Sequence, residues 1–240
     1  MPWFKKRLKS RCFRRSCHEK LKNNIKLLIA ADGGAGSGKT TGSKLIAKKY
    51  GFKLLTSGLL YRFIAYKLLK TKKIKSRNLF LKKITKKITS KDLKNRNLFS
   101  TEVTKYTSEI AKIKRIRDLL KSYQIKFTKN RLCIIEGRDI GTVVIPKADL
   151  KLFFKCSLNT KAKRRFEEYR KTNKRISFNE VKKAIKLRDS NDSKRKISPL
   201  KPAKDAVIVD TSKVNKKQML TKLSKIVEEK LKEKYGRKYL

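Results

Sequence analysis

The chain has 240 residues, with 69 Lys or Arg against 19 Asp or Glu and a formal net charge of +50. Its apolar residues, 38% of the total, gather in clear runs, which excludes a chain that is disordered throughout. No run is long enough to span a membrane and no signal-peptide core is visible, so we expect a cytoplasmic protein without a membrane partner. The four cysteines lack the paired spacing of a metal site and the pattern of a secreted disulfide scaffold.

The excess positive charge has two interpretations. One is contact with nucleic acid, an anionic membrane or small anions. The other is a lysine-biased genome that spreads Lys over every solvated face. Lys dominates Arg, and the lysines lie along the whole chain rather than in one stripe, which favours the second interpretation for most of the charge. We therefore expect no specific nucleic acid partner.

Residues 1–24 are basic and precede the first predicted strand. We expect a disordered extension there, ahead of one folded domain that covers residues 25–240. A transit segment, a membrane-surface helix and a start codon placed too early are the alternatives.

Residues 25–31 form an apolar run of the length of a buried strand, and a glycine-rich loop follows directly. The segment from Gly33 to Thr40 fits G-x-x-x-x-G-K-[ST], with a second threonine at Thr41, and helical periodicity starts at once behind it. Glycines let backbone N–H groups curl around an anion, and the helix N-terminus adds partial positive charge. The loop therefore predicts a site for nucleotide phosphates, with Lys39 reaching the terminal ones and a hydroxyl near Mg²⁺.

Further apolar runs predict strands at residues 52–55, 132–135, 150–154 and 206–209. Helical stretches separate them, and a closing amphipathic helix carries Met219 to Leu231. Strands that alternate with helices predict an α/β fold with a five-stranded parallel sheet covered on both faces.

In such a sheet, ligands bind beyond the carboxyl ends of the strands. We therefore expect the phosphate loop, residues 56–62 and residues 137–139 to meet in one cleft. Arg62 and Arg138 are candidates for a second phosphate, because guanidinium binds phosphate through a fork of donors. One of the acids Glu136 and Asp139 would hold Mg²⁺ through water or accept a base amino group; for Glu136, an ion pair with a nearby Lys is the alternative.

Two further clusters are candidates for the site. Arg164 and Arg165 follow the predicted strand at residues 150–154, on a segment that would bring positive charge over a transferring phosphoryl group and exclude water. Ser177 and Glu180 predict a capping box for a helix that runs towards Arg188. On a helix, the spacings of the run R-D-x-x-D-x-x-R would place its charged residues on one face. It predicts ligand binding or arginine positioning, with a salt-bridge ladder as the alternative. Its members are Arg188, Asp189, Asp192 and Arg195.

Four segments now carry a resemblance, in the order DGGAGSGKTT, LTSGLLYR, EGRDIGTVVIPKADLKLFF and RDSNDSKRKISPLKPAKDAVIVDTS. They are similar to motifs of the bacterial-type cytidylate kinases, P-loop nucleoside monophosphate kinases that phosphorylate CMP and dCMP with ATP. The resemblance covers residues 25–231. It implies the P-loop NTPase fold, with an inserted monophosphate-binding subdomain at residues 71–131 and a short arginine-bearing lid at residues 159–175.

The resemblance also implies roles for individual residues. It assigns the phosphates of ATP to Gly33, Gly34, Ala35, Gly36, Ser37, Gly38, Lys39, Thr40 and Thr41, with Thr40 or Thr41 near Mg²⁺. It assigns catalysis to Lys39, Arg138, Arg164 and Arg165. It assigns CMP binding to Ser57, Arg62, Ser108, Arg117, Arg138, Asp139, Arg188, Asp192 and Arg195. We expect a monomer whose partners are CMP or dCMP and ATP.

The chain departs from the family pattern in its phosphate loop. The family usually has Pro and Ser where Gly34 and Ala35 stand, and small residues there should preserve the cradle. Two rivals to this function stay open, namely a P-loop kinase for another small acceptor and a nucleic-acid-binding protein with a vestigial loop. Most aromatic residues fall on predicted strands and helix faces rather than among basic residues, which counts against the second rival.

Overall fold

The computed structural model describes residues 21, 24–71, 73–171 and 176–236. Most of the predicted N-terminal extension therefore lies outside the described residues. Leu21, which belongs to it, is buried in the hydrophobic core. In the part of the chain that is described, no helix is both long and apolar enough to cross a membrane.

The centre of the fold is a five-stranded, all-parallel sheet in the order β2-β3-β1-β4-β5, which confirms the predicted fold class. The strands are β1 Leu27–Gly33, β2 Lys53–Thr56, β3 Leu132–Gly137, β4 Leu150–Lys155 and β5 Val207–Asp210. The middle strand β1 pairs with β3 in a register that sets Asp32 opposite Gly137. The carboxyl ends of these two strands, which precede the phosphate loop and the Arg138–Asp139 pair, are therefore neighbours.

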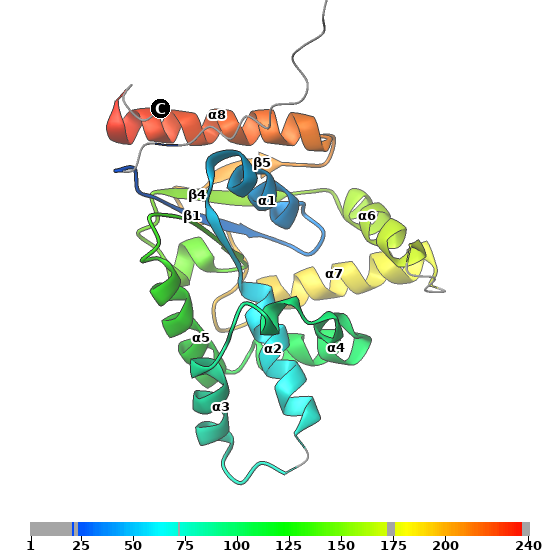
Figure 1. Cartoon of the computed structure of the whole chain (residues 1–240). Helices are drawn as coiled ribbons and strands as arrows, with labels where there is room; N and C mark the ends of the chain where they lie inside the picture. Colours follow the sequence, from blue (N-terminus) through cyan, green and yellow to red (C-terminus); the bar gives the residue numbers. More distant parts are fainter. Residues whose placement is uncertain (1–20, 22–23, 72, 172–175, 237–240) are drawn as a thin grey trace, which may run out of the picture.

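Helices cover both faces of the sheet (Figure 1). One face packs against α1 Lys39–Tyr50 and α8 Lys216–Tyr235, in a core that includes Ile29 of β1. The other face packs against α2 Ser57–Lys70 and α5 Lys114–Phe127. Successive residues of a strand point to opposite faces, so a strand covered on both sides is apolar throughout.

The segment between α2 and α5 forms a separate lobe on the side of the sheet away from α8 (Figure 1). It contains α3 Arg77–Lys86, the short 3₁₀ turns Asp92–Lys94 and Arg96–Phe99, and α4 Thr101–Ile110. Buried apolar residues fix this lobe on α2, namely Leu81, Leu98, Val103 and Ile110.

Beyond β4, the chain forms a helical hairpin of α6 Leu158–Arg170 and α7 Phe178–Lys194. It has its own small core, in which the rings of Phe166 and Phe178 meet edge to face at 5.9 Å. The predicted capping box at the start of α7 is present, because Ser177 and Glu180 bond each other's backbone N–H groups. The helix α7 runs past its predicted end at about Arg188, whereas Arg195 lies just beyond it with extended backbone. Asp189 and Asp192 therefore lie on α7 beyond its predicted end, and Arg195 follows the helix.

Candidate active site

The phosphate loop joins β1 to α1 at the carboxyl edge of the sheet. Gly36 and Gly38 have φ angles of 69° and 81°, a left-handed conformation that disfavours a β-carbon. Because α1 begins at Lys39, its first backbone N–H groups have no acceptor within the helix and face the loop. The end of the loop therefore presents backbone donors suited to an anion.

Lys39 lies folded back over this loop, with its Nζ donating to the Gly34 carbonyl at 3.3 Å. Burial, followed by the charge of Arg138, lowers the pKa of Lys39 to about 7. A lysine with a lowered pKa takes up a proton when an anion binds beside it, because the opposite charge favours the ammonium form.

Glu136, at the end of β3, lies directly beneath the loop. The Thr40 hydroxyl donates to Glu136 Oε1 at 2.9 Å, and the side chain is buried. Among the residues that the structure describes, Glu136 Oε2 has no hydrogen-bond partner. A hydroxyl beside an unpartnered carboxylate oxygen is the donor set that Mg²⁺ accepts when substrate phosphates and water complete its shell. The described residues contain no group of three or more His, Cys, Asp or Glu that could hold a metal alone.

Across from the loop, two acids alternate with three arginines. Asp139 forms an ion pair with the buried Arg117 of α5 and lies 3.6 Å from Arg195. Asp192 of α7 pairs with Arg138 at 2.9 Å and lies 3.7 Å from Arg195. We call these five residues the acceptor lattice; they are Arg117, Arg138, Asp139, Asp192 and Arg195. The predicted convergence of strand ends is therefore present, and the salt-bridge ladder considered from the sequence exists within it.

Two more arginines of the predicted site lie beside the lattice, and burial lowers the pKa of both. Arg62 donates to the Leu98 carbonyl at 2.7 Å and to Thr104 Oγ1 at 2.8 Å. Burial, and after it the charge of Arg188, lowers the pKa of Arg62 to about 10. Burial and then Arg138 likewise lower the pKa of Arg188, whose buried Nε has no acceptor in the described part of the chain.

Arg62 on α2, Arg138 directly after β3 and Arg188 on α7 affect one another electrostatically, since, in addition to burial, the charge of Arg188 lowers the pKa of Arg62 and the charge of Arg138 lowers the pKa of Arg188. Their mutual repulsion is relieved by an anion, and guanidinium is the side chain that matches phosphate geometry. The sequence predicted a second phosphate site at Arg62 and Arg138, and the family resemblance added Arg188; this role stays a prediction.

The serines of the predicted site have different surroundings. Ser57 is buried at the start of α2, where its hydroxyl accepts from Gln124 Nε2 at 2.6 Å. A β-carbon on Gly137 would lie 3.4 Å from that of Ser57, so Ser57 borders the end of β3. Ser108 is half-buried on α4, and it is not a member of the acceptor lattice.

The two predicted lid arginines lie on α6. Arg164 donates to the Thr211 carbonyl at 2.6 Å and reaches the Gly36 carbonyl of the phosphate loop at 3.5 Å. Arg165 pairs with Glu168 on its own helix at 2.7 Å and stacks on Tyr169. In this structure Arg164 contacts the loop directly, whereas Arg165 has local partners.

Three residues that contact this site were not identified from the sequence as part of it. Asp32 is buried and accepts from the backbone N–H groups of Ile140 and Gly141 at 2.8 and 2.7 Å, which ties β1 to the turn after Asp139. Its position directly before Gly33 was the available signal. Lys161 of α6 and Gln124 of α5 carried none, because neither belongs to a motif and lysine occurs throughout the chain.

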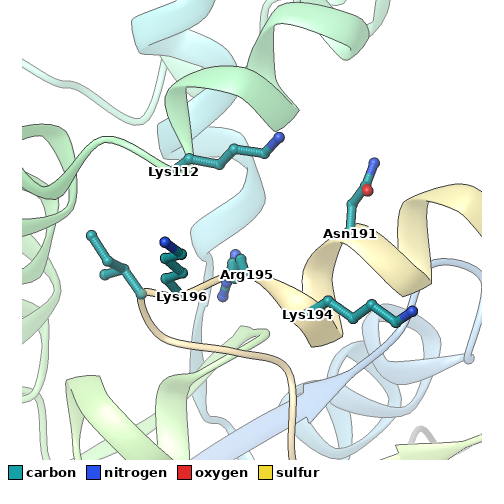
Figure 2. Close-up of a pocket in the computed structure, with 6 residues that line it drawn as sticks. Lys112, Asn191, Lys194, Arg195 and Lys196 are labelled. Atoms are coloured by element: carbon teal, nitrogen blue, oxygen red, sulfur yellow. The ribbon is translucent and has the colours of Figure 1, made fainter.

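A cavity of about 430 Å³ opens beside the acceptor lattice at Arg195 (Figure 2). Figure 2 shows Lys112, from the turn after α4, opposite Asn191 and Lys194 of α7. The remaining lining residues are Lys196 and Ile197. Arg195 is thus the member of the acceptor lattice that lines this cavity.

Comparison with known proteins identifies relatives over most of the chain. The family model described as cytidylate kinase matches residues 29–229. A cytidylate kinase of Thermotoga neapolitana is 38% identical over 225 residues, covering 85% of this chain and 98% of that protein. Cytidylate kinases of Thermosipho melanesiensis and Fusobacterium nucleatum are 37% and 36% identical, covering 85% and 84% of this chain and 98% and 97% of those proteins.

Proposed function

The chain belongs to the cytidylate kinase family, and on that premise we propose that it transfers the γ-phosphoryl group of ATP to CMP or dCMP, yielding ADP and CDP or dCDP. The observation that carries the proposal is the pair of anion sites at neighbouring strand ends. One is the phosphate loop after β1, and the other is the cluster of Arg62, Arg138 and Arg188 beside β3.

On the donor side, the loop from Gly33 to Thr41 surrounds the ATP phosphates, and the free backbone N–H groups at the start of α1 donate to them. Lys39 supplies the positive charge at the β- and γ-phosphates. The lid arginines Arg164 and Arg165 neutralise charge that develops during transfer, and closure of the lid excludes water. No covalent intermediate is needed, because positioning and electrostatic stabilisation account for phosphoryl transfer.

On the acceptor side, Arg62, Arg138 and Arg188 hold the phosphate of CMP. Cytosine offers an amino donor next to ring and carbonyl acceptors. Asp139 therefore accepts a hydrogen bond from the amino group, while Arg117 and Ser108 donate to the acceptors. Uracil would turn an acceptor towards Asp139 and leave buried groups unpaired, which costs binding free energy. Ser57, Asp192 and Arg195 complete this side of the site.

The donor set at the loop fits Mg²⁺. Thr40 and Glu136 would hold the ion, because Glu136 Oε2 is buried without a partner in the described residues and lies on the carboxylate that Thr40 already contacts. When bound, Mg²⁺ supplies charge neutralisation at the phosphates.

The proposal also covers the localisation, the oligomeric state and the division of the chain into segments. We propose that the protein is cytoplasmic and monomeric, and that it has no specific nucleic acid partner. We also propose that residues 71–131 act as the monophosphate-binding subdomain and residues 159–175 as the lid within the domain 25–240, with residues 1–24 as an extension.

The test is a coupled assay of ADP release from ATP with CMP, dCMP, UMP and AMP as acceptors. We expect kcat/KM for CMP or dCMP to exceed that for UMP and AMP by at least about 100-fold, because a site that bonds an amino group discriminates strongly against its loss. Preferential use of AMP, or release of ADP without any acceptor dependence, would contradict the proposal.

A further inference from the structure

Asp189 makes a contact that neither nucleotide site requires. It lies on α7, and its Oδ1 accepts from the backbone N–H of Ala35 in the phosphate loop at 2.9 Å. Its Oδ2 accepts from Lys161 Nζ of α6 at 2.7 Å. Both side chains are half-buried, with 20% of Asp189 and 15% of Lys161 exposed. One carboxylate therefore joins the loop to both helices of the hairpin.

Gly34 is what makes room for this carboxylate. A β-carbon at position 34 would lie 2.8 Å from both carboxylate oxygens of Asp189, closer than side-chain carbons approach such atoms. The backbone does not demand glycine there, since the loop residues with positive φ are Gly33, Gly36 and Gly38. The glycine at position 34 is thus explained by the space that Asp189 occupies.

The place of the contact separates it from the phosphate-binding donors. The free N–H groups of α1 begin at Lys39, whereas Asp189 binds Ala35 in the first half of the loop. The negative charge of Asp189 is paired with Lys161, which reduces its repulsion of bound phosphates. The backbone of Lys161 also packs on the loop, because a β-carbon on Gly36 would lie 3.3 Å from its carbonyl oxygen.

We propose that Asp189 is a positioning residue, a latch that docks the α6–α7 hairpin on the phosphate loop and holds the Lys161 ammonium beside it, and that Gly34 admits this latch. The proposal rests on the proposed phosphoryl transfer for its effect on rate. Docking brings the cation of Lys161 and the guanidinium of Arg164 to the loop together, since both lie on α6.

A double-mutant cycle in the full chain tests the coupling. Gly34→Ala and Asp189→Ala should each lower kcat about tenfold, with KM for CMP unchanged, because both release the same latch. The double variant should be no slower than Asp189→Ala alone, since the added methyl group acts only by displacing the carboxylate. Independent effects, which multiply to about 100-fold in the double variant, would overturn the proposal.

Further variants separate the two contacts of Asp189, namely its hydrogen bond with the Ala35 N–H and its ion pair with Lys161. Asp189→Asn keeps an acceptor for the Ala35 N–H but loses the ion pair, so it should match Lys161→Met in kcat, and combining the two should add nothing. Glu233→Gln, which removes an exposed acid that pairs with Lys230 on α8, is the charge control and should leave kcat unchanged. A fall in KM for ATP in Asp189→Ala would mean that the carboxylate competes with phosphate, and would overturn the latch.

Amide hydrogen exchange tests the latch without any catalysis, so its outcome is distinct from that of the proposed function. In nucleotide-free protein, Asp189→Ala and Gly34→Ala should each speed exchange in α6, residues 158–170, and leave α8 unchanged. Unchanged exchange in α6 for both variants would reject the latch even if the protein transfers phosphoryl groups. Faster exchange in a protein without kinase activity would support the latch and reject the proposed function.

Discussion

The two halves of the proposed site are built in different ways. The donor half is made almost entirely of backbone, in a single loop that spans Gly33 to Thr41, with Lys39 as its one cation. The acceptor half is made of side chains from α2 and α5, from the turn after β3, and from α7 and the residue that follows it, and arginines and acids alternate in its ion pairs. The phosphate loop is one continuous stretch of the sequence. The proposed site for a base and its phosphate, by contrast, exists only when the fold brings distant segments together.

The difference also predicts how each half responds to mutation. The donor half depends on one lysine, so its loss has no substitute within the loop. The acceptor half shares its charges, since Asp139 and Asp192 each contact two arginines. Loss of one member should weaken substrate selection without abolishing transfer.

The largest effect is expected from Lys39→Ala. Removing the only cation of the loop should lower kcat by about 1,000-fold, because charge stabilisation at the transferring group is lost. CMP binding, measured by calorimetry, should stay within about twofold, since the acceptor lattice is intact. Lys44→Ala, at an exposed position on the same helix, is the control. Near-wild-type turnover of Lys39→Ala would contradict the account of the donor half.

Asp139→Asn should affect the acceptor half alone. The substitution leaves Arg117 and Arg195 facing a neutral amide, and we expect kcat/KM for CMP to fall by about 100-fold. KM for ATP should change less than about twofold. Asp118→Asn, an exposed neighbour of Arg117 on α5, is the matched control. An equal rise in KM for both nucleotides would show that the two halves are not separable.

Asp32 joins the halves, and its effect should appear in the pH dependence of stability. Burial raises the pKa of Asp32 from 3.8 to about 6, although its two backbone hydrogen bonds lower it. The folded protein therefore binds more protons than the unfolded chain between about pH 4 and 6, and this contribution to stability is lost as pH rises through about 6.

The comparison of wild type with Asp32→Asn isolates this contribution. The difference in the free energy of unfolding between the two proteins should change by about 3 kcal/mol between pH 4 and pH 7, as measured by urea denaturation. A difference that is constant across this range would mean that Asp32 does not titrate as a buried group.

The smallest effect is expected from salt. With a net charge of +50, self-repulsion acts over the whole molecule and is screened over about 10 Å at 0.1 M salt. The melting temperature should therefore rise by a few degrees between low and moderate NaCl. A melting temperature that does not rise would mean that the charges are already neutralised within the fold.

The contrast between continuous segments and contacts of distant segments also explains what could be predicted from the sequence. The strands and the phosphate loop give contiguous signals, namely apolar runs and glycine spacing, and the fold class was confirmed. The end of α7 was misjudged because its last turns are charged and face the lattice, so apolar periodicity stops at Ile185 before the helix does.

Contacts between distant segments left no local signal. The bond from the Ala35 N–H to Asp189 and the ion pair of Lys161 depend on how the hairpin packs on the loop. Asp139 was a candidate from its position after a predicted strand, whereas its partner Arg117 was reached only through the family resemblance. The roles proposed for these residues remain predictions that the variants above test.

The most direct test of the two-site account is a calorimetric titration of wild-type protein with CMP and with a non-hydrolysable ATP analogue, each alone and each in the presence of the other. The account predicts that one molecule of each binds per chain and that both are bound at once, because the phosphate loop and the acceptor lattice are separate surfaces. Mutual displacement of CMP and the ATP analogue would contradict it, since the two nucleotides would then share one site.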